Sequence, residues 1–93
     1  MDIRPDNILI HEIIGLKVEV VDSLNKSLIG LKGKIIDETM KTLIIHTSKG
    51  RKVVEKKVAV FVFELPSGLK VKVEGKYLVG RPEDRLKRRL KFW

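Results

Sequence analysis

The sequence has no cysteine, no glutamine and no long apolar run, and these absences narrow what the protein can be. Without cysteine the chain can form neither disulfides nor thiolate metal sites. Its longest apolar run, residues 58–63, is far shorter than the roughly 20 residues that a membrane-spanning helix needs. The first twelve residues contain acidic side chains and no apolar signal core. We therefore expect a cytoplasmic protein with no membrane partner.

Residues that could carry catalysis are also scarce. The two histidines, His11 and His46, do not belong to an HxH or HExxH spacing, so nothing indicates metal ligation. Asp37 and Glu38 are adjacent, and adjacent residues of a strand point to opposite faces, which makes them a poor carboxylate pair. No serine lies in a nucleophile elbow. We expect no catalytic residue, no metal site and no cofactor in this chain.

Positive charge, in contrast, is abundant and unevenly placed. The net charge is +8, and it comes from the second half: residues 49–93 hold 14 Lys and Arg against 5 Asp and Glu. A small domain with one strongly basic half favours a polyanionic partner such as nucleic acid. The alternative is a highly charged, thermostable surface, but thermophile usage raises Lys and Glu together and does not explain the excess. Aromatic residues make up only 5%, which favours contact with the backbone of folded RNA over base stacking.

The pattern of apolar residues is that of a small β protein. Alternating stretches of five to ten residues are separated by turn formers, and no helix long enough for a parallel crossover lies between them. Glycines at strand ends and inside strands are typical of sharp bends in a small barrel. We predict an all-β fold with helical termini: a small Sm-like or SH3-like antiparallel barrel of about six strands. The expected strands cover residues 16–20, 29–38, 42–47, 51–56, 58–65 and 69–73, with a short addition at 77–79.

The two ends have a different character. Residues 1–15 contain Pro5, which suits the first turn of a helix, and end at Gly15, which suits its stop. They predict a short helix or an apolar arm. Residues 81–93 combine Pro82 in a first turn with apolar residues at helical spacing, and predict a basic amphipathic helix. The chain is thus expected to be one domain in three parts: this arm, a barrel over 16–80, and the tail helix.

The hairpin "GKIIDETMKTLIIHT", residues 33–47, resembles the first Sm motif. Gly33, Asp37 and Met40 match a pattern in which a hydrophobic-Asp-x-x-Met-Asn run spans the turn between two strands. Lys41 stands where Sm proteins keep a uridine-binding asparagine. The resemblance favours an Sm-like barrel, with Asp37 and Thr39 shaping the turn. Lys41 favours backbone contact in place of base reading.

A second resemblance covers nearly the whole chain. The stretches "RPDNILIHEIIGLKVEVVDS", "GLKGKIIDETMKTLII", "EKKVAVFVFELPSG" and "VEGKYLVGRPEDR" are similar, in order, to the archaeal ribonuclease P protein component 1 family. The resemblance implies an Sm-like subunit of the ribonucleoprotein endonuclease that removes the 5′ leader from precursor tRNA. It also implies that the RNA subunit carries the chemistry with its magnesium. The implied partners are that RNA, precursor tRNA indirectly, a small zinc-containing protein subunit and other protein subunits.

For that role, basic side chains of the barrel and tail are expected to contact phosphate: Lys32, Lys34, Lys41, Lys49, Arg51, Lys52, Lys56, Lys57, Arg81, Arg85, Arg88 and Arg89. Apolar side chains of the two ends are expected to form a protein interface: Ile8, Leu9, Ile13, Leu86 and Leu90. The alternatives are an Sm-like homo-oligomeric RNA-binding or protein-interaction module and, from a third class, a stand-alone nuclease.

Overall fold

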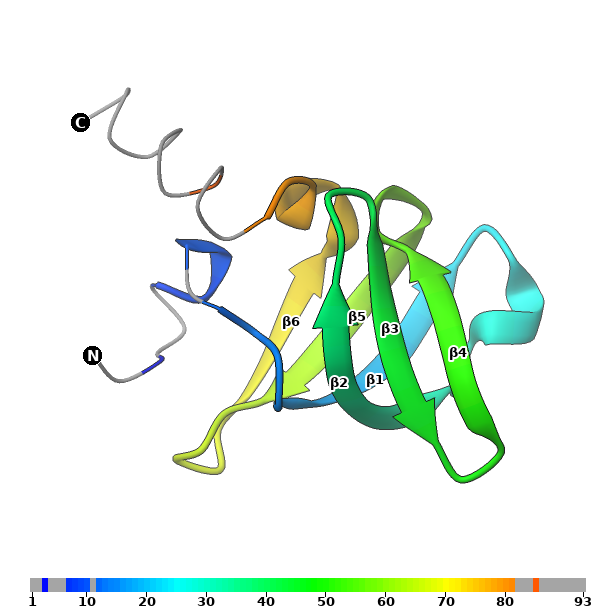
Figure 1. Ribbon diagram of the computed structural model, residues 1–93, viewed down its shortest axis with the longest axis horizontal. Coiled ribbons are helices and arrows are strands. Elements are labelled where there is room, and N and C mark those ends of the chain that lie inside the picture. The colour runs from blue at the N-terminus through cyan, green and yellow to red at the C-terminus, as the bar shows by residue number, and fades with distance from the viewer. Residues whose placement is uncertain (1–2, 4–6, 11, 82–84, 86–93) are drawn as a thin grey trace.

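The structure, a computed structural model, describes Ile3, residues 7–10, residues 12–81 and Arg85 (Figure 1). Its strands are β1 (Lys17–Ser23), β2 (Lys32–Glu38), β3 (Thr42–Thr47), β4 (Gly50–Glu55), β5 (Ala59–Glu64) and β6 (Lys70–Glu74). Four short 3-10 turns are η1 (Ile8–Ile10), η2 (Lys26–Leu28), η3 (Lys56–Val58) and η4 (Gly75–Leu78). None of the helical elements within the described residues is long and apolar enough to cross a membrane.

The six strands form one antiparallel sheet in the order β4-β3-β2-β1-β5-β6. The turn between β3 and β4 shows how the sequence sets a connection. Gly50 has a φ of 105°, a backbone conformation that residues with a Cβ rarely adopt. The hydroxyl of Thr47 donates to the carbonyl of Gly50 at 2.8 Å and accepts from the N–H of Lys49 at 3.1 Å. These bonds fix a tight return of the chain.

The expected closed barrel is wrong. The sheet has the expected number of strands, but β4 and β6 are its two outermost strands and do not pair with each other. Figure 1 shows an open sheet that is strongly curled, with β2, β3 and β4 in front of β1 and β5. The alternation of apolar residues and the internal glycines predict curvature equally well for an open sheet and for a barrel. Closure depends on pairing between the two edges, which the pattern does not specify.

The expected helical ends are wrong as far as the structure describes them. In the N-terminal arm the helical element is the 3-10 turn η1, three residues long. A last short strand was expected at residues 77–79, but the 3-10 turn η4 occupies residues 75–78. Most of the expected tail helix, residues 82–84 and 86–93, lies outside the described residues.

The core lies on the inner face of the curled sheet. In β5 the alternation is regular, with Phe61 and Phe63 fully buried and their ring centroids 5.9 Å apart. All six strands contribute to one apolar cluster, which also takes in Ile8, Ile13 and Leu78 from outside the sheet. The sheet bends closely at Gly33, where a Cβ atom would lie 2.1 Å from the carbonyl oxygen of His46. Glycine is therefore required there for the close approach of β2 and β3.

Two β-bulges interrupt the alternation in the same way. The register shifts in β1 between Val20 and Asp22, and in β2 between Ile35 and Asp37. In both cases the aspartate carboxylate accepts the N–H of the next residue, at 2.9 Å in β1 and 2.8 Å in β2. Asp37 is thus a bulge residue. Because the bulge adds one residue, Ile35 and Glu38 are both buried although they are three positions apart.

Candidate nucleic-acid interface

The strand register places a row of mainly basic residues across the whole outer face of the sheet. Each residue of this row is the direct cross-strand partner of the next. From β4 to β6 the residues, which we call the basic row, are Arg51, His46, Lys34, Lys17, Glu64 and Lys70. Five steps between strands span roughly 24 Å at about 4.8 Å per step. The row therefore places four permanent cations around the outside of the curled sheet (Figure 1), over a length of several nucleotides.

A second, shorter row lies beside the first. Lys32, Glu19, Val62 and Lys72 are cross-strand partners two positions along each strand from members of the basic row. Because side chains alternate between faces, residues two apart share a face, and both rows belong to the outer surface. Together the two rows contain six cations and two carboxylates, so their net charge is strongly positive.

Two ion pairs partly neutralise the face. Lys17 Nζ lies 3.6 Å from a Glu64 oxygen, and Lys32 Nζ lies 3.9 Å from a Glu19 oxygen. Both pairs are long and exposed, and such pairs contribute about 0–1 kcal/mol. The lysines therefore remain able to turn toward another anion. Lys34, Lys70 and Arg51 are exposed and form no ion pair with the described residues in the structure.

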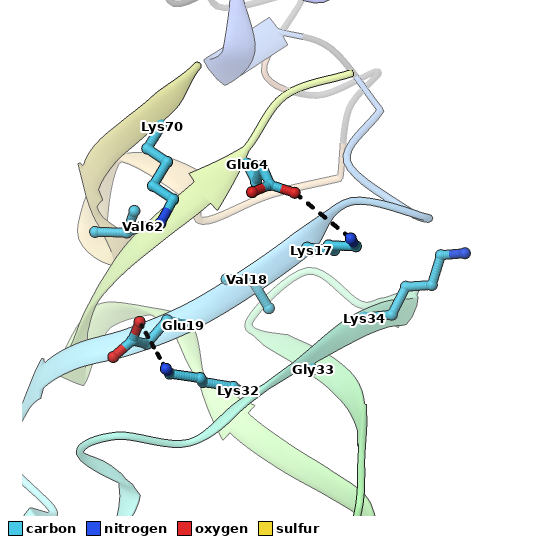
Figure 2. Close-up of a pocket in the computed structure, with 9 residues that line it drawn as sticks. All are labelled: Lys17, Val18, Glu19, Lys32, Gly33, Lys34, Val62, Glu64 and Lys70. Carbon is cyan, nitrogen blue, oxygen red and sulfur yellow. Dashed lines mark ion pairs between the residues drawn. The ribbon is translucent and has the colours of Figure 1, made fainter. Parts of the chain in front are cut away.

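A groove of about 450 Å³ lies where the two rows adjoin (Figure 2). It is formed by strands β1, β2, β5 and β6, and its lining residues are Lys17, Val18, Glu19, Lys32, Gly33, Lys34, Val62, Glu64 and Lys70. Figure 2 shows the ammonium groups of Lys17 and Lys32 reaching toward the carboxylates of Glu64 and Glu19 across this surface. The basic face is thus hollowed in its middle.

The structure brings together some of the expected phosphate contacts and separates others. Lys34 and Arg51 belong to the basic row, and Lys32 to the neighbouring row. Lys49 lies in the β3–β4 turn, two residues before Arg51 of β4. Four further residues are exposed but belong to neither row: Lys41, Lys52, Lys57 and Arg81. Arg88 and Arg89 lie outside the described residues.

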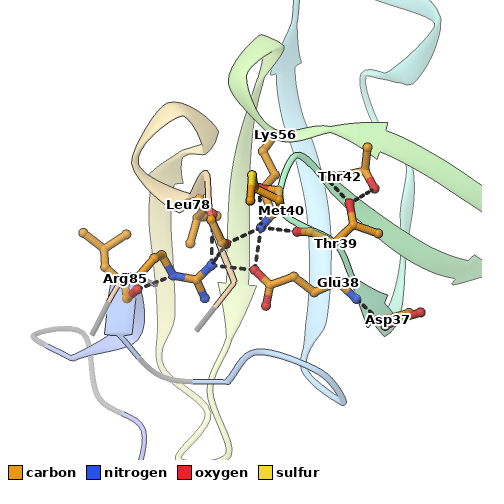
Figure 3. Close-up of polar contacts among 10 residues, drawn as sticks. Asp37, Glu38, Thr39, Met40, Thr42, Lys56, Leu78 and Arg85 are labelled. Carbon is orange, nitrogen blue, oxygen red and sulfur yellow. Dashed lines mark hydrogen bonds and ion pairs between the residues drawn. The ribbon is translucent and has the colours of Figure 1, made fainter. Parts of the chain in front are cut away.

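Two expected phosphate contacts are buried. The side chain of Lys56 has no exposed surface and that of Arg85 has 2%, so neither can reach a phosphate in this conformation. Both donate to the same oxygen of Glu38, Lys56 Nζ at 2.6 Å and Arg85 Nη1 at 2.6 Å (Figure 3). We call Glu38, Lys56 and Arg85 the charged cluster. The expectation that Lys56 and Arg85 bind RNA does not fit their place in it.

The charged cluster also binds backbone from distant parts of the chain. Lys56 Nζ donates to the carbonyl of Thr39 at 2.8 Å and to that of Gly80 at 2.9 Å. Arg85 donates to the carbonyls of Leu78 at 2.9 Å and Gly80 at 2.5 Å, and its Nε donates to that of Leu9. A buried cation needs such partners. The cluster therefore joins the β2–β3 hairpin, the segment after η4 and the N-terminal arm.

The expected protein interface is largely internal. Ile8 and Ile13 are 2% and 0% exposed and belong to the core of this chain. Leu9 is 38% exposed and is available to a partner. Leu86 and Leu90 lie outside the described residues.

Sequence reasoning missed several members of the outer face. Lys17, Lys70, Lys72 and His46 were not among the expected contacts. The signal was present in the alternation of strands 17–23 and 70–74, which puts these lysines on the face opposite the core. The strand register that aligns these lysines with Lys34 could not be predicted from the alternation.

Lys76, which lies outside the two rows, has a raised pKa. Glu74 beside Lys76 raises the pKa of that lysine above its usual 10.5, so Lys76 is fully charged at neutral pH. Among the described residues, no group of three or more His, Asp or Glu side chains could hold a metal ion. The chemistry that the arrangement supports is the binding of a polyanion.

The chain is similar to known proteins of one family. The family described as ribonuclease P/MRP, subunit p29, matches residues 6–88. A "Ribonuclease P protein component 1" of Methanocaldococcus jannaschii is 58% identical over 91 residues, which are 97% of this chain and 95% of that protein. The protein of the same name from Thermofilum pendens is 49% identical over the full length of both chains. The solved structure of Mth11, a homologue of human RNase P protein Rpp29, has a TM-score of 0.60 and 42% identity, covering 81% of this chain and 97% of that one.

Proposed function

The chain belongs to the ribonuclease P/MRP subunit p29 family and is a protein subunit of ribonuclease P, and we propose that the basic row is the surface with which it binds the RNA of that enzyme. Ribonuclease P is an RNA-based enzyme of tRNA processing, and this chain is not itself catalytic. Its contribution is then to the folding and positioning of RNA inside the ribonucleoprotein. The observation that carries the proposal is the alignment of four cations across six strands.

The chemistry of the row suits an RNA backbone. Phosphate contacts from Lys and Arg position a protein on nucleic acid without reading sequence, and each contact releases bound counterions. The lysines of the row are largely exposed, so contact with phosphate desolvates them little. The ammonium of Lys17 can exchange Glu64 for a phosphate at small cost, because their pair is long and exposed.

The same proposal extends to the rest of the particle. A small zinc-containing protein subunit is expected to bind at the N-terminal arm, where Leu9 is exposed. Magnesium is expected at the RNA subunit, and by neutralising phosphates the chain lowers the magnesium concentration that this RNA needs. Precursor tRNA is then contacted indirectly, in the cytoplasm.

The experiment is reconstitution of precursor-tRNA cleavage from the RNA subunit and the other protein subunits, with and without this chain. We expect the chain to shift the magnesium dependence of cleavage to lower concentration. The doubly reversed variant Lys34→Glu with Lys70→Glu should lose most of that shift. An unchanged magnesium dependence when the chain is omitted would contradict the proposal.

A matched control is Lys26→Glu with Lys76→Glu, which changes the net charge by the same amount. Both residues are exposed and lie near the C-terminal end of β1, whereas the basic row crosses β1 at its first residue, Lys17. The control should retain the magnesium shift. If both double variants fail equally, net charge and not the basic row is responsible.

A further inference from the structure

The carboxylates of the groove on the basic face are less exposed than the lysines paired with them. Glu64 and Glu19 expose 38% and 40% of their side-chain surface, whereas their partners Lys17 and Lys32 expose 76% and 72%. The more exposed lysines form a positive rim around the two carboxylates. Lys34 and Lys70 extend the positive rim on either side.

The two carboxylates repel a phosphate from the middle of the groove, and the lysines around them attract one. A phosphate that entered the groove would face two carboxylates, and each carboxylate is neutralised by one long ion pair only. A carboxylate is instead an acceptor for the exocyclic amine of a base, as in the pairing of Glu with cytosine N4. The rim lysines would then hold the phosphates on either side of that base.

The groove also offers apolar surface to the ring of a base. Val62 lines it, and Gly33 contributes only backbone there. A volume of about 450 Å³ lies within the range of roughly 300–1,000 Å³ typical of small-ligand sites. Sequence-specific proteins commonly hold unstacked bases of single-stranded RNA in such sites.

We propose that the groove between Glu19, Glu64 and Val62 is a subsite for one unstacked RNA base that carries an exocyclic amine. Glu64 accepts from the amine, Val62 contacts the ring, and Lys17, Lys34 and Lys70 bind the flanking phosphates. The inference rests on the proposed function, because it places one recognised nucleotide inside the RNA-binding face. It adds base reading to a surface that otherwise contacts backbone.

Cytidine and uridine oligonucleotides test the subsite, because these bases differ in having an amine or a carbonyl at the same ring position. Fluorescently labelled single-stranded heptamers of C and of U are titrated with the full chain at constant salt. We expect C to bind about fivefold or more tightly than U, the discrimination of one good base contact. Equal affinity for the two oligonucleotides would overturn the subsite.

The variant Glu64→Gln should bring the ratio of the C and U affinities to within about twofold, since glutamine can donate to the uracil carbonyl as well as accept. The control Glu74→Gln changes net charge equally on the same face of β6 but outside the groove, and should keep the ratio. A ratio unchanged by Glu64→Gln, in a variant that melts like the parent protein, would also overturn the subsite.

The two proposals fail in distinguishable ways. Reversal of Lys34 and Lys70 should weaken C and U alike, because phosphates are common to both. Loss of affinity on that reversal without any preference for C leaves the proposed function standing and removes the subsite. Affinity for both oligonucleotides that ignores salt and the reversal would contradict the proposed function itself.

Discussion

The basic row and the charged cluster use the same kinds of residue in opposite ways. In the basic row, Lys17 and Glu64 are 3.6 Å apart and open to water. In the charged cluster, Lys56 and Glu38 are 2.6 Å apart and 0% and 1% exposed. An exposed pair contributes about 0–1 kcal/mol, whereas breaking a buried one costs about 3–5 kcal/mol. The exposed pair can therefore exchange partners at little cost, whereas the buried pair holds the fold.

The neighbours Lys56 and Lys57 give the sharpest test of the difference between buried and exposed lysines, because Lys56 is buried and Lys57 is exposed. Lys56→Glu would bury two carboxylates beside one arginine. We expect the variant to lose about 5 kcal/mol or more of its free energy of unfolding, enough to unfold many small domains. Lys57→Glu should change the free energy of unfolding by less than about 0.5 kcal/mol. Urea unfolding followed by circular dichroism measures both. Equal stability of the two variants would show that Lys56 is not buried with Glu38.

The central carboxylate gives the next largest effect. Glu38→Gln removes the carboxylate that the buried cations Lys56 and Arg85 share, and should cost about 3–5 kcal/mol. For a chain of this size 3 kcal/mol lowers the melting temperature by roughly 12–24 °C. The control Glu55→Gln removes the same charge from an exposed site on β4 and should melt within a few degrees of the parent protein.

A single change in the basic row should affect binding and leave stability intact. Lys34→Ala removes one phosphate contact, so the slope of log affinity against log salt should fall in magnitude by about 0.7–0.9. Its free energy of unfolding should stay within about 0.5 kcal/mol of the parent value. Titration of RNA at several salt concentrations provides the slope. A slope equal to that of the parent protein would remove Lys34 from the interface.

The smallest effect concerns an exposed pair outside both regions, Lys76 and Glu74, 3.5 Å apart. Glu74 raises the pKa of Lys76, so the contribution of the pair is complete below pH 10.5 and is lost as the pH rises through the raised value. Glu74→Gln should return the pKa toward 10.5, which a side-chain NMR titration of Lys76 measures. No measurable change in stability is expected at neutral pH.

The fold was predictable to the extent that local pattern determines it. The alternation of residues 17–23 and 59–64 predicts strands with one buried face, and the structure has both. The closed barrel was wrong because closure is a contact between β4 and β6, which are distant in sequence and carry no mark of whether they pair. The bulge at Asp37 was equally invisible, and it is the bulge that turns Glu38 inward.

The positive charge of the site was predictable from the sequence, but the identity of the residues that form it was not. Lysine density pointed to a polyanion, but it could not separate Lys56 from Lys57. A signal did exist: Lys56 lies two residues after the buried Val54, on the face that alternation assigns to the core. Its meaning depends on Glu38 and Gly80, which are 18 and 24 positions away. Arg85 has no comparable local mark.

The charged cluster does for this cysteine-free chain what a covalent cross-link does elsewhere. The bond from Arg85 to the carbonyl of Leu9 joins positions 76 residues apart, and Lys56 closes two shorter loops through Thr39 and Gly80. Because the entropy of loop closure rises only slowly with loop length, a few such bonds can hold segments from both halves of the chain together. Unlike a disulfide, this fastening is indifferent to reductant, and it opens when a single charge is lost.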